Sequence, residues 1–253
     1  MTVKQLPLDI LFNDADYVAV TKPAGLATIP GRAELDSVLE RLGREIGLPF
    51  SGTVDPRLRV VHRLDKDTSG VLLFAKHLDA QRHVSFQFQN NTIRKEYLAI
   101  VTGRPSTETG TVDEPLAPHP TSRDRMCVTK HGRSATTEWK LEKSYRVASL
   151  LRVFPKTGKT HQIRVHLRHI GLPLLIDPLY HPREPRFPGV MLSTFKRDYR
   201  PSRRDEERPL ISRLTLHAEK LTFVHRDGRM IELVSPLPRD FRATVNQLSR
   251  IVR

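Results

Sequence analysis

The stretch 60–76 constrains the fold most, because it places a dense polar loop between two apolar runs. Val60 and Val61 are typical of the end of one strand, and residues 71–75 are typical of another. Loops fixed between rigid strands commonly carry reactive groups, so we predict that Asp65 is the reactive group of this protein. The alternative is that Asp65 and Asp67 only form a turn by bonding their own backbone.

The net charge narrows the possible partners. The chain has 42 Lys and Arg residues against 28 Asp and Glu residues, a formal net charge of +14. Such an excess favours a polyanionic partner, because each neutralised phosphate releases bound counterions. Nucleic acid is the leading candidate. An anionic membrane surface would require a long basic amphipathic helix, which the sequence does not show, and solubility alone is the remaining alternative.

The length and the apolar pattern indicate an ordinary globular protein. The chain has 253 residues, enough for one or two domains. No apolar run approaches the roughly 20 residues of a membrane helix, and the N-terminus lacks the apolar core of a signal peptide. The single cysteine, Cys127, excludes a disulfide within the chain and a multi-cysteine zinc site. We therefore expect a cytoplasmic protein that does not enter a membrane.

Hydrophobic periodicity predicts an irregular mixture of helices and strands. Helical spacing covers 37–47, 78–90, 161–170 and 239–251, and strand patterns cover 17–20, 94–101, 135–141, 149–154, 214–223 and 230–234. Thr160 is the expected cap of the third helix, and residues 102–121 are expected to be a connection. Strand 94–101 is apolar on both faces, which predicts a central position in a sheet. This order favours an α+β fold with a mixed, largely antiparallel sheet.

Two possible metal sites fail on the identity or spacing of their residues. The loop that starts at Asp65 resembles a calcium loop, but Lys76 occupies the twelfth position, where the bidentate Glu belongs. His161, His166 and His169 lack the spacing of a zinc protease. We expect these three histidines to lie near phosphate instead, and we expect no metal.

Four segments together resemble one family. Residues 62–70 match its His-Arg-Leu-Asp-x-x-Thr-Ser-Gly signature, and residues 22–25, Lys-Pro-Ala-Gly, resemble its first motif. Residues 95–97 and 158–166 resemble its Lys-x-Tyr and Gly-Arg-Thr-His-Gln-Ile-Arg-Val-His segments. The chain is thus similar to the RluA-type RNA pseudouridine synthases, in the short form without an N-terminal S4 domain.

The resemblance implies an isomerase that acts on RNA. Such enzymes break the N1–C1′ bond of a uridine, turn the base and rejoin it through C5, without a cofactor. The implied fold is a mixed, largely antiparallel sheet with flanking helices and loops around a central RNA-binding cleft, here as one catalytic domain over residues 1–253. The implied partner is a tRNA or an rRNA, bound by a monomer with no obligatory protein partner. A non-catalytic RNA-binding protein with the same fold is the alternative.

The resemblance also implies the catalytic residues. Asp65 is the carboxylate that stabilises or attacks the reacting sugar or base, and its mode of attack stays open. Arg164 is its buried partner and keeps it ionised, because a planar fork can hold a carboxylate with two bonds. Tyr97 stacks on the base and is placed for the C5 proton.

Four further residues complete the predicted substrate-binding set. Arg63 fills the gap left when the target base is flipped out, and Ile163 forms an apolar wall for the uracil ring. Thr68 shapes the loop that aims Asp65, and His62 is a loop residue rather than a catalyst.

The chain departs from the family pattern after the Arg164 helix. The usual Gly-Asp-x-x-Tyr-Gly is replaced by Ile-Asp-Pro-Leu-Tyr-His at 176–181, which we expect to be remote from the reactive motif. Residues 182–209 follow as a proline-rich surface insertion, which we expect at the rim of the RNA site.

Overall fold

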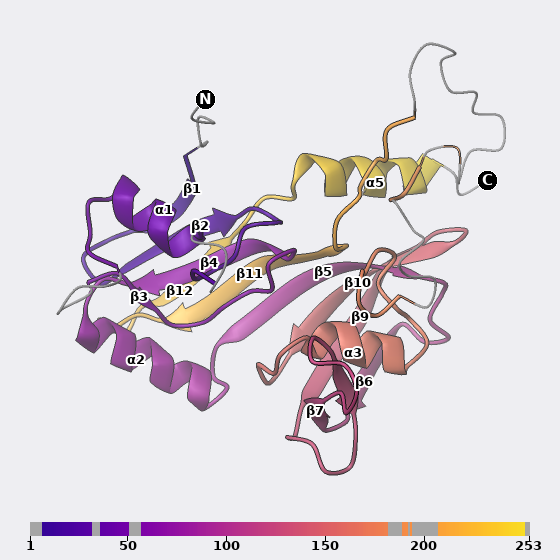
Figure 1. The fold of residues 1–253 in the computed structure, drawn as a ribbon, viewed down its shortest axis with the longest axis horizontal. Coiled ribbons are helices and arrows are strands. Elements are labelled where there is room, and N and C mark those ends of the chain that lie inside the picture. The colour runs from indigo at the N-terminus through magenta and orange to yellow at the C-terminus, as the bar shows by residue number, and fades with distance from the viewer. Residues whose placement is uncertain are drawn as a thin grey trace. The chain divides into compact units, whose positions relative to one another are not determined.

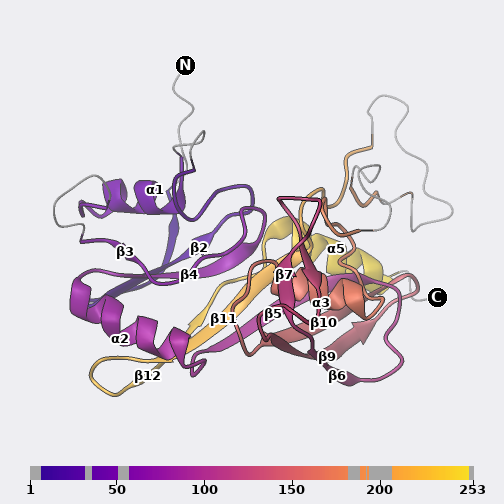
Figure 2. The ribbon, with the colours of Figure 1, turned by 60° about the horizontal axis from the view of Figure 1, so that its bottom comes forward.

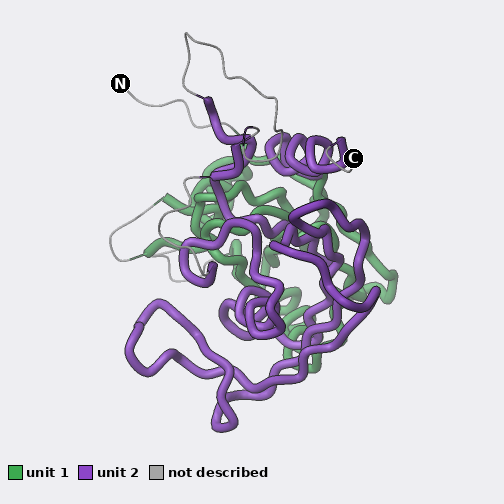
Figure 3. The backbone as a smooth tube through the Cα atoms, turned by 90° about the vertical axis from the view of Figure 1, so that its right-hand side faces the viewer, with its two compact units in different colours: residues 1–95, 218–236 green, residues 96–217, 237–253 purple. Residues whose placement is uncertain are grey.

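The computed structural model describes residues 7–31, 36–50, 57–181, 189–191, 193 and 207–250. The chain divides into two compact units (Figure 3). Unit 1 comprises Met1–Lys95 and Ala218–Pro236, and unit 2 comprises Glu96–His217 and Leu237–Arg253. The secondary structure is α+β, as predicted. Antiparallel strand pairs predominate: β1–β2, β2–β4, β3–β4 and β11–β12 in unit 1, and β5–β10, β9–β10, β6–β9 and β7–β8 in unit 2. The predicted insertion at 182–209 lies mostly outside the described residues.

Unit 1 is built on a sheet whose strands follow the order β1-β2-β4-β11, with β3 paired to β4 and β12 paired to β11. The strands are β1 (Asp9–Asn13), β2 (Tyr17–Lys22), β3 (Arg59–Val60), β4 (Ser69–Ala75), β11 (Leu216–Val224) and β12 (Met230–Val234). In the β2–β4 pair, Lys22 lies opposite Gly70 and Tyr17 lies opposite Ala75. The Asp65 loop therefore adjoins the Lys22 end of these strands.

Two helices flank the unit 1 strands. Helix α1 (Val38–Glu45) begins where the Ser37 side chain accepts a hydrogen bond from the Glu40 amide. Helix α2 (Leu78–Gln89) packs Ala80 and Val84 into a core with alternate residues of β2 and β4. Figures 1 and 2 show α1 and α2 on opposite faces of these strands. Both faces are thus covered, which explains why every residue of β4 is buried.

Unit 2 holds the antiparallel order β5-β10-β9-β6 and a separate β7–β8 hairpin. The elements are β5 (Arg94–Thr102), β6 (Thr109–Asp113), β7 (Leu116–Pro118), β8 (Met126–Val128), β9 (Thr136–Ser144), β10 (Ala148–Pro155), α3 (Gln162–His169) and α5 (Arg239–Arg250). One face of β5 packs Ala99 with Leu167 of α3, and the other packs Ile100 with Phe241 of α5. The prediction that this strand lies centrally in a sheet is confirmed.

The structure corrects two expectations about secondary structure and adds two strands. Residues 102–121 are not a plain connection, because β6 and β7 lie within them. Helix α3 begins after His161, which has a left-handed φ of 54° and supplies no side-chain cap, so Thr160 is not the cap residue. Strands β1 and β8 were not predicted. None of the helices in the described part of the chain is long and apolar enough to cross a membrane.

Candidate active site

Asp65 lies at the start of a tight turn in unit 1. The Asp65 carbonyl accepts a hydrogen bond from the Thr68 amide at 3.1 Å, which closes the turn. Thr68 and Ser69 are buried, Asp65 is half-buried, and Arg63 is exposed. The end of the turn at Thr68 and Ser69 is therefore enclosed, while Arg63 is exposed. The turn predicted at Asp65 is present.

Lys22 clamps the residue that follows Asp65. Its side chain is fully buried, and its ammonium donates hydrogen bonds to the carbonyls of Pro23 at 2.8 Å, Leu26 at 2.7 Å and Lys66 at 2.6 Å. The Gly25 amide also donates to the Lys66 carbonyl, at 2.9 Å. The Lys-Pro-Ala-Gly segment thus fixes the turn that carries the proposed carboxylate. The sequence pattern alone did not indicate this role for the motif.

Two more contacts fix the ends of the loop. The Thr28 hydroxyl bonds both the amide and the carbonyl of Leu64 at 3.2 Å, directly before Asp65. On the far side, Gly70 has a φ of +127°, and a Cβ there would lie 2.1 Å from the carbonyl oxygen of Ala218. Only glycine fits at this position, so the glycine of the signature is explained by close backbone packing.

His62 is held as a neutral structural residue. Its ring stacks on Phe88 with centroids 4.8 Å apart, and its Nε2 accepts a hydrogen bond from the Leu73 amide at 3.0 Å. Burial, with a smaller contribution from the Lys95 charge, lowers the pKa of His62 to about 3. Burial also lowers the pKa of Lys95 to about 8. A ring that accepts a backbone hydrogen bond and stays neutral is suited to shaping the loop.

Tyr97 and Ile163 share one apolar cluster in unit 2. Tyr97 lies on β5 opposite Val153 of β10, and its half-buried side chain packs against the cluster that contains Ile163. Ile163 lies in the first turn of α3, immediately before Arg164. Tyr97 and residues 162–164, which are far apart in sequence, therefore supply neighbouring parts of unit 2.

Arg164 is buried and paired with a carboxylate that sequence analysis did not identify. Its Nε and Nη2 atoms donate to the two carboxylate oxygens of Asp177, both at 2.8 Å. Asp177 is fully buried, and its Oδ1 also accepts the amides of Leu179 at 2.9 Å and Tyr180 at 3.0 Å. The Tyr180 ring lies beneath the guanidinium, with its centroid 5.0 Å from Cζ. The segment 176–181 therefore holds Arg164, a role that the sequence pattern did not indicate.

The start of α3 is fixed by Gln162. Its Oε1 accepts hydrogen bonds from the Lys159 amide at 2.9 Å and the Thr157 hydroxyl at 2.7 Å. The expectation that His166 contacts phosphate is wrong. That side chain is fully buried and bonded to the Thr137 hydroxyl at 2.9 Å and the Glu114 carbonyl at 3.0 Å. Burial lowers the pKa of His166, which therefore stays neutral as a structural residue.

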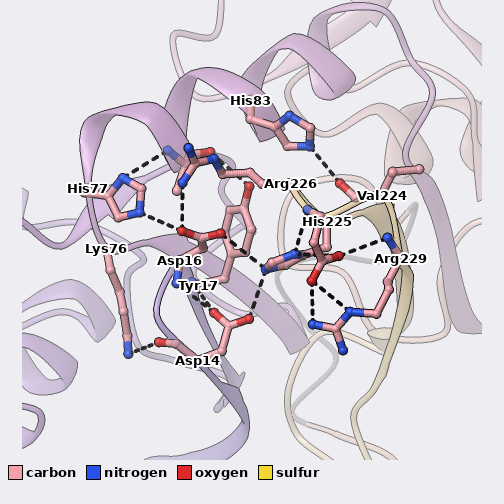
Figure 4. Close-up of polar contacts among 12 residues, drawn as sticks. Asp14, Asp16, Tyr17, Lys76, His77, His83, Val224, His225, Arg226 and Arg229 are labelled. Atoms are coloured by element: carbon pink, nitrogen blue, oxygen red, sulfur yellow. Dashed lines mark hydrogen bonds and ion pairs between the residues drawn. The ribbon is translucent and has the colours of Figure 1, made fainter.

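A second polar cluster occupies the opposite end of the unit 1 strands (Figure 4). Asp16 is bonded by His77 at 2.7 Å and by Arg226 at 2.9 Å, and His225 lies 3.0 Å from Asp14. Burial raises the pKa of Asp16, but these hydrogen bonds outweigh it and hold that pKa below its usual value. Strand β2 separates this cluster from Lys22 by roughly 16 Å, at about 3.3 Å per residue. The cluster joins turns and lies away from Asp65.

The predicted site residues thus fall into two groups. Unit 1 carries His62, Arg63, Asp65 and Thr68, and unit 2 carries Tyr97, Ile163 and Arg164. Residues 16–169, which include all seven, match the family described as RNA pseudouridylate synthase. The chain belongs to the RNA pseudouridine synthase family. It is therefore an isomerase that converts uridine in RNA to pseudouridine.

Curated relatives agree over nearly the full chain. A protein of Haemophilus ducreyi named ribosomal large subunit pseudouridine synthase D is 36% identical over 248 residues, covering 97% of this chain and 72% of the relative. The protein of the same name from Escherichia coli K12 is 36% identical over 241 residues, covering 94% and 69%. The predicted resemblance to the RluA-type synthases is confirmed.

Solved structures agree on the fold. Human RNA pseudouridylate synthase domain containing 4 superposes with a TM-score of 0.72 at 26% identity, covering 95% of this chain and 93% of that structure. Human RNA pseudouridylate synthase domain containing 1 superposes with a TM-score of 0.68 at 23% identity, covering 91% and 84%. The predicted α+β pseudouridine synthase fold is therefore confirmed.

Proposed function

We propose that Asp65 is the catalytic carboxylate of the isomerisation. Cleavage of the N1–C1′ bond develops positive charge on the sugar, and an adjacent carboxylate can stabilise that charge or form a bond. The observation that carries the proposal is the clamp around the turn, in which buried Lys22 and Thr28 bond the residues on either side of Asp65. A fixed backbone is what a positioned reactive group requires.

Arg164 is proposed to keep the Asp65 carboxylate ionised. An isolated carboxylate in a closed pocket tends to protonate, and a neighbouring guanidinium opposes this. The bidentate pair with Asp177 engages Nε and Nη2 of the Arg164 guanidinium. Asp177 balances the charge of a buried Arg164 and fixes the plane of its guanidinium.

The remaining site residues are proposed to handle the base. Tyr97 is assigned to stack on the uracil and to receive the C5 proton, and Ile163 is assigned to wall the ring. Arg63, which is exposed, is assigned to replace the flipped base in the RNA stack. His62 and Thr68 shape the loop without joining the chemistry, which suits a neutral, stacked imidazole and a buried threonine.

We propose that the substrate is large-subunit ribosomal RNA. Relatives at 36% identity are named for the large ribosomal subunit, which favours rRNA over tRNA. The net charge of +14 suits a polyanion of that kind. We further propose that the enzyme acts as a monomer in the cytoplasm and that residues 182–209 contribute to the choice of RNA.

Tritium release from RNA labelled at C5 of uridine tests both parts of this proposal. Large-subunit rRNA and bulk tRNA are supplied as separate substrates, and release is expected from rRNA. Asp65→Asn should abolish release while RNA binding is retained, and Asp67→Asn serves as the matched control and should retain release. Turnover by Asp65→Asn would overturn the assignment of the carboxylate. Release from tRNA alone would overturn the assignment of the RNA.

A further inference from the structure

A basic hairpin protrudes from unit 2 and packs against α3. We define it as residues 116–133, which contain β7, β8 and the loop between them. Arg123, Lys130 and Arg133 are exposed, and Asp124 is the single acidic residue of the hairpin. Figures 1 and 2 both place β7 beside α3. The exposed charge suits contact with RNA phosphates, so the position of the hairpin bears on substrate binding.

The base of the hairpin is anchored on Tyr180. Leu116 packs in one buried cluster with Val165 of α3 and Tyr180, and Met126 and Val128 pack against that cluster. Tyr180 is 2% exposed, and its hydroxyl oxygen accepts a hydrogen bond from the Met126 amide at 2.7 Å. A strand of the hairpin is therefore bonded directly to a residue outside it.

The same hydroxyl also contacts the start of α3. His161 Nδ1 lies 2.8 Å from the Tyr180 oxygen, and the two rings meet edge to face. The hydroxyl oxygen thus has two polar partners, the Met126 amide, which donates to it, and His161 Nδ1. One hydroxyl thus joins the hairpin, the segment after α3 and the residue that begins α3.

The ring and backbone of Tyr180 contact the buried pair of Arg164 and Asp177 rather than the hairpin. The ring lies beneath the Arg164 guanidinium, and the Tyr180 amide bonds the Asp177 carboxylate that holds Arg164. Arg164 is itself 5% exposed and has little room to shift. Any displacement of Tyr180 therefore changes both the hairpin anchor and the setting of Arg164.

We propose that Tyr180 is a positioning residue that couples the basic hairpin to Arg164. Its hydroxyl fixes the position of the hairpin and so affects RNA binding. Its ring fixes the orientation of the Arg164 guanidinium and so affects the rate of the chemical step. The second half of this inference rests on the proposed role of Arg164. The first half depends only on the hairpin and can be tested by itself.

Two substitutions separate the two halves. Tyr180→Phe removes the hydroxyl and keeps the ring, so KM for RNA should rise about tenfold while kcat stays within a factor of two. Tyr180→Leu removes both the hydroxyl and the ring, so kcat should fall in addition to the rise in KM. Tyr145→Phe is the matched control, because Tyr145 is 1% exposed and lies in a different cluster of the same unit.

Limited trypsin digestion gives a readout that does not depend on activity. Cleavage after Arg123, Arg125 or Lys130 should be about tenfold faster in Tyr180→Phe than in Tyr145→Phe, with thermal unfolding checked for both. Equal cleavage rates together with an unchanged KM would overturn the coupling. A fall in kcat without a rise in KM for Tyr180→Phe would overturn the division between hydroxyl and ring. If Asp65→Asn retained turnover, the proposed chemistry would fail, but the digestion result would still decide the role of the hydroxyl.

Discussion

Replacing Lys22 by methionine tests whether the clamp positions Asp65. The change removes an ammonium that bonds three carbonyls in a fully buried setting. The Lys66 carbonyl keeps the Gly25 amide as a hydrogen-bond donor. The main loss therefore falls on the carbonyls of Pro23 and Leu26, which lose the hydrogen bond from the Lys22 ammonium. Each buried carbonyl left without a donor costs about 1–3 kcal/mol. Methionine removes the desolvation cost of the buried ammonium, which offsets part of that cost, so the expected loss in the free energy of unfolding is about 2–4 kcal/mol.

The effect on catalysis should exceed the effect on folding. A displacement of the reacting group by about 1 Å can lower the rate on the order of 100-fold, so kcat in the tritium-release assay should fall by about that factor in folded Lys22→Met. Urea denaturation measures the stability term, and assays well below the unfolding transition isolate the catalytic term. Lys76→Met is the matched control, since Lys76 bonds the Asp14 carbonyl at the opposite end of the unit 1 strands. A kcat within threefold of wild type for Lys22→Met would refute the positioning role.

Three further outcomes follow from the geometry of unit 1. Gly70→Ala should lower the free energy of unfolding by about 3 kcal/mol or more in urea denaturation, because its Cβ would meet the Ala218 carbonyl at 2.1 Å, whereas Gly228→Ala, with open space around it, should lose only about 1 kcal/mol. His62 should stay neutral in an NMR titration down to about pH 4. The folded pKa of His62 is depressed to about 3, so the free energy of unfolding of wild type should fall by up to about 1.4 kcal/mol per pH unit as the pH is lowered from 6.5 to about 3. The free energy of unfolding of His62→Phe should fall less over the same range. A His62 titration near pH 6.5 would contradict this. Asp16→Asn should destabilise unit 1 by about 1–3 kcal/mol at neutral pH. The difference from wild type should begin to shrink as the pH falls below 3.8, the ordinary value, and should vanish only below the lower pKa that Asp16 has in the folded state; a constant difference would contradict the lowered pKa.

Local patterns were sufficient to predict most elements of the fold. The alternation of Tyr97, Ala99 and Val101 with Leu98 and Ile100 predicted a strand covered on both faces, and the structure places these sets in two separate clusters. Such periodicity survives because each face packs independently against its own helix. The signature 62–70 likewise predicted a turn at Asp65, because turn chemistry is encoded within a few residues.

Long-range contacts account for what was missed. Residues 102–121 look like a connection because they are rich in glycine and proline, yet Gly110 pairs with Trp139, and a Cβ at that glycine would lie 2.5 Å from the indole. The glycine is required by a residue 29 positions away in the chain, which no local pattern reveals. The burial of His166 could not be predicted for the same reason, because its partners Glu114 and Thr137 lie far from it in the sequence. Lys22 was missed because lysine is rarely buried without a partner, and its partners are carbonyls that every sequence contains.

Two buried cations mark the parts of the chain proposed for chemistry. Lys22 is enclosed by carbonyls beside Asp65, and Arg164 is enclosed by Asp177 and Tyr180. Lys22 stabilises the fold through its three carbonyl bonds and also fixes the turn that carries Asp65. The buried Arg164–Asp177 pair, by contrast, contributes little net stability, because desolvation offsets most of the attraction, and apolar residues of the same volume would stabilise the fold as well or better. Burying this pair does, however, fix the orientation of the guanidinium, since each hydrogen bond in an enclosed setting has few alternative partners. Arg164 is therefore better explained by positioning than by stability, and the Asp and Tyr of the segment after α3 are explained by the same requirement.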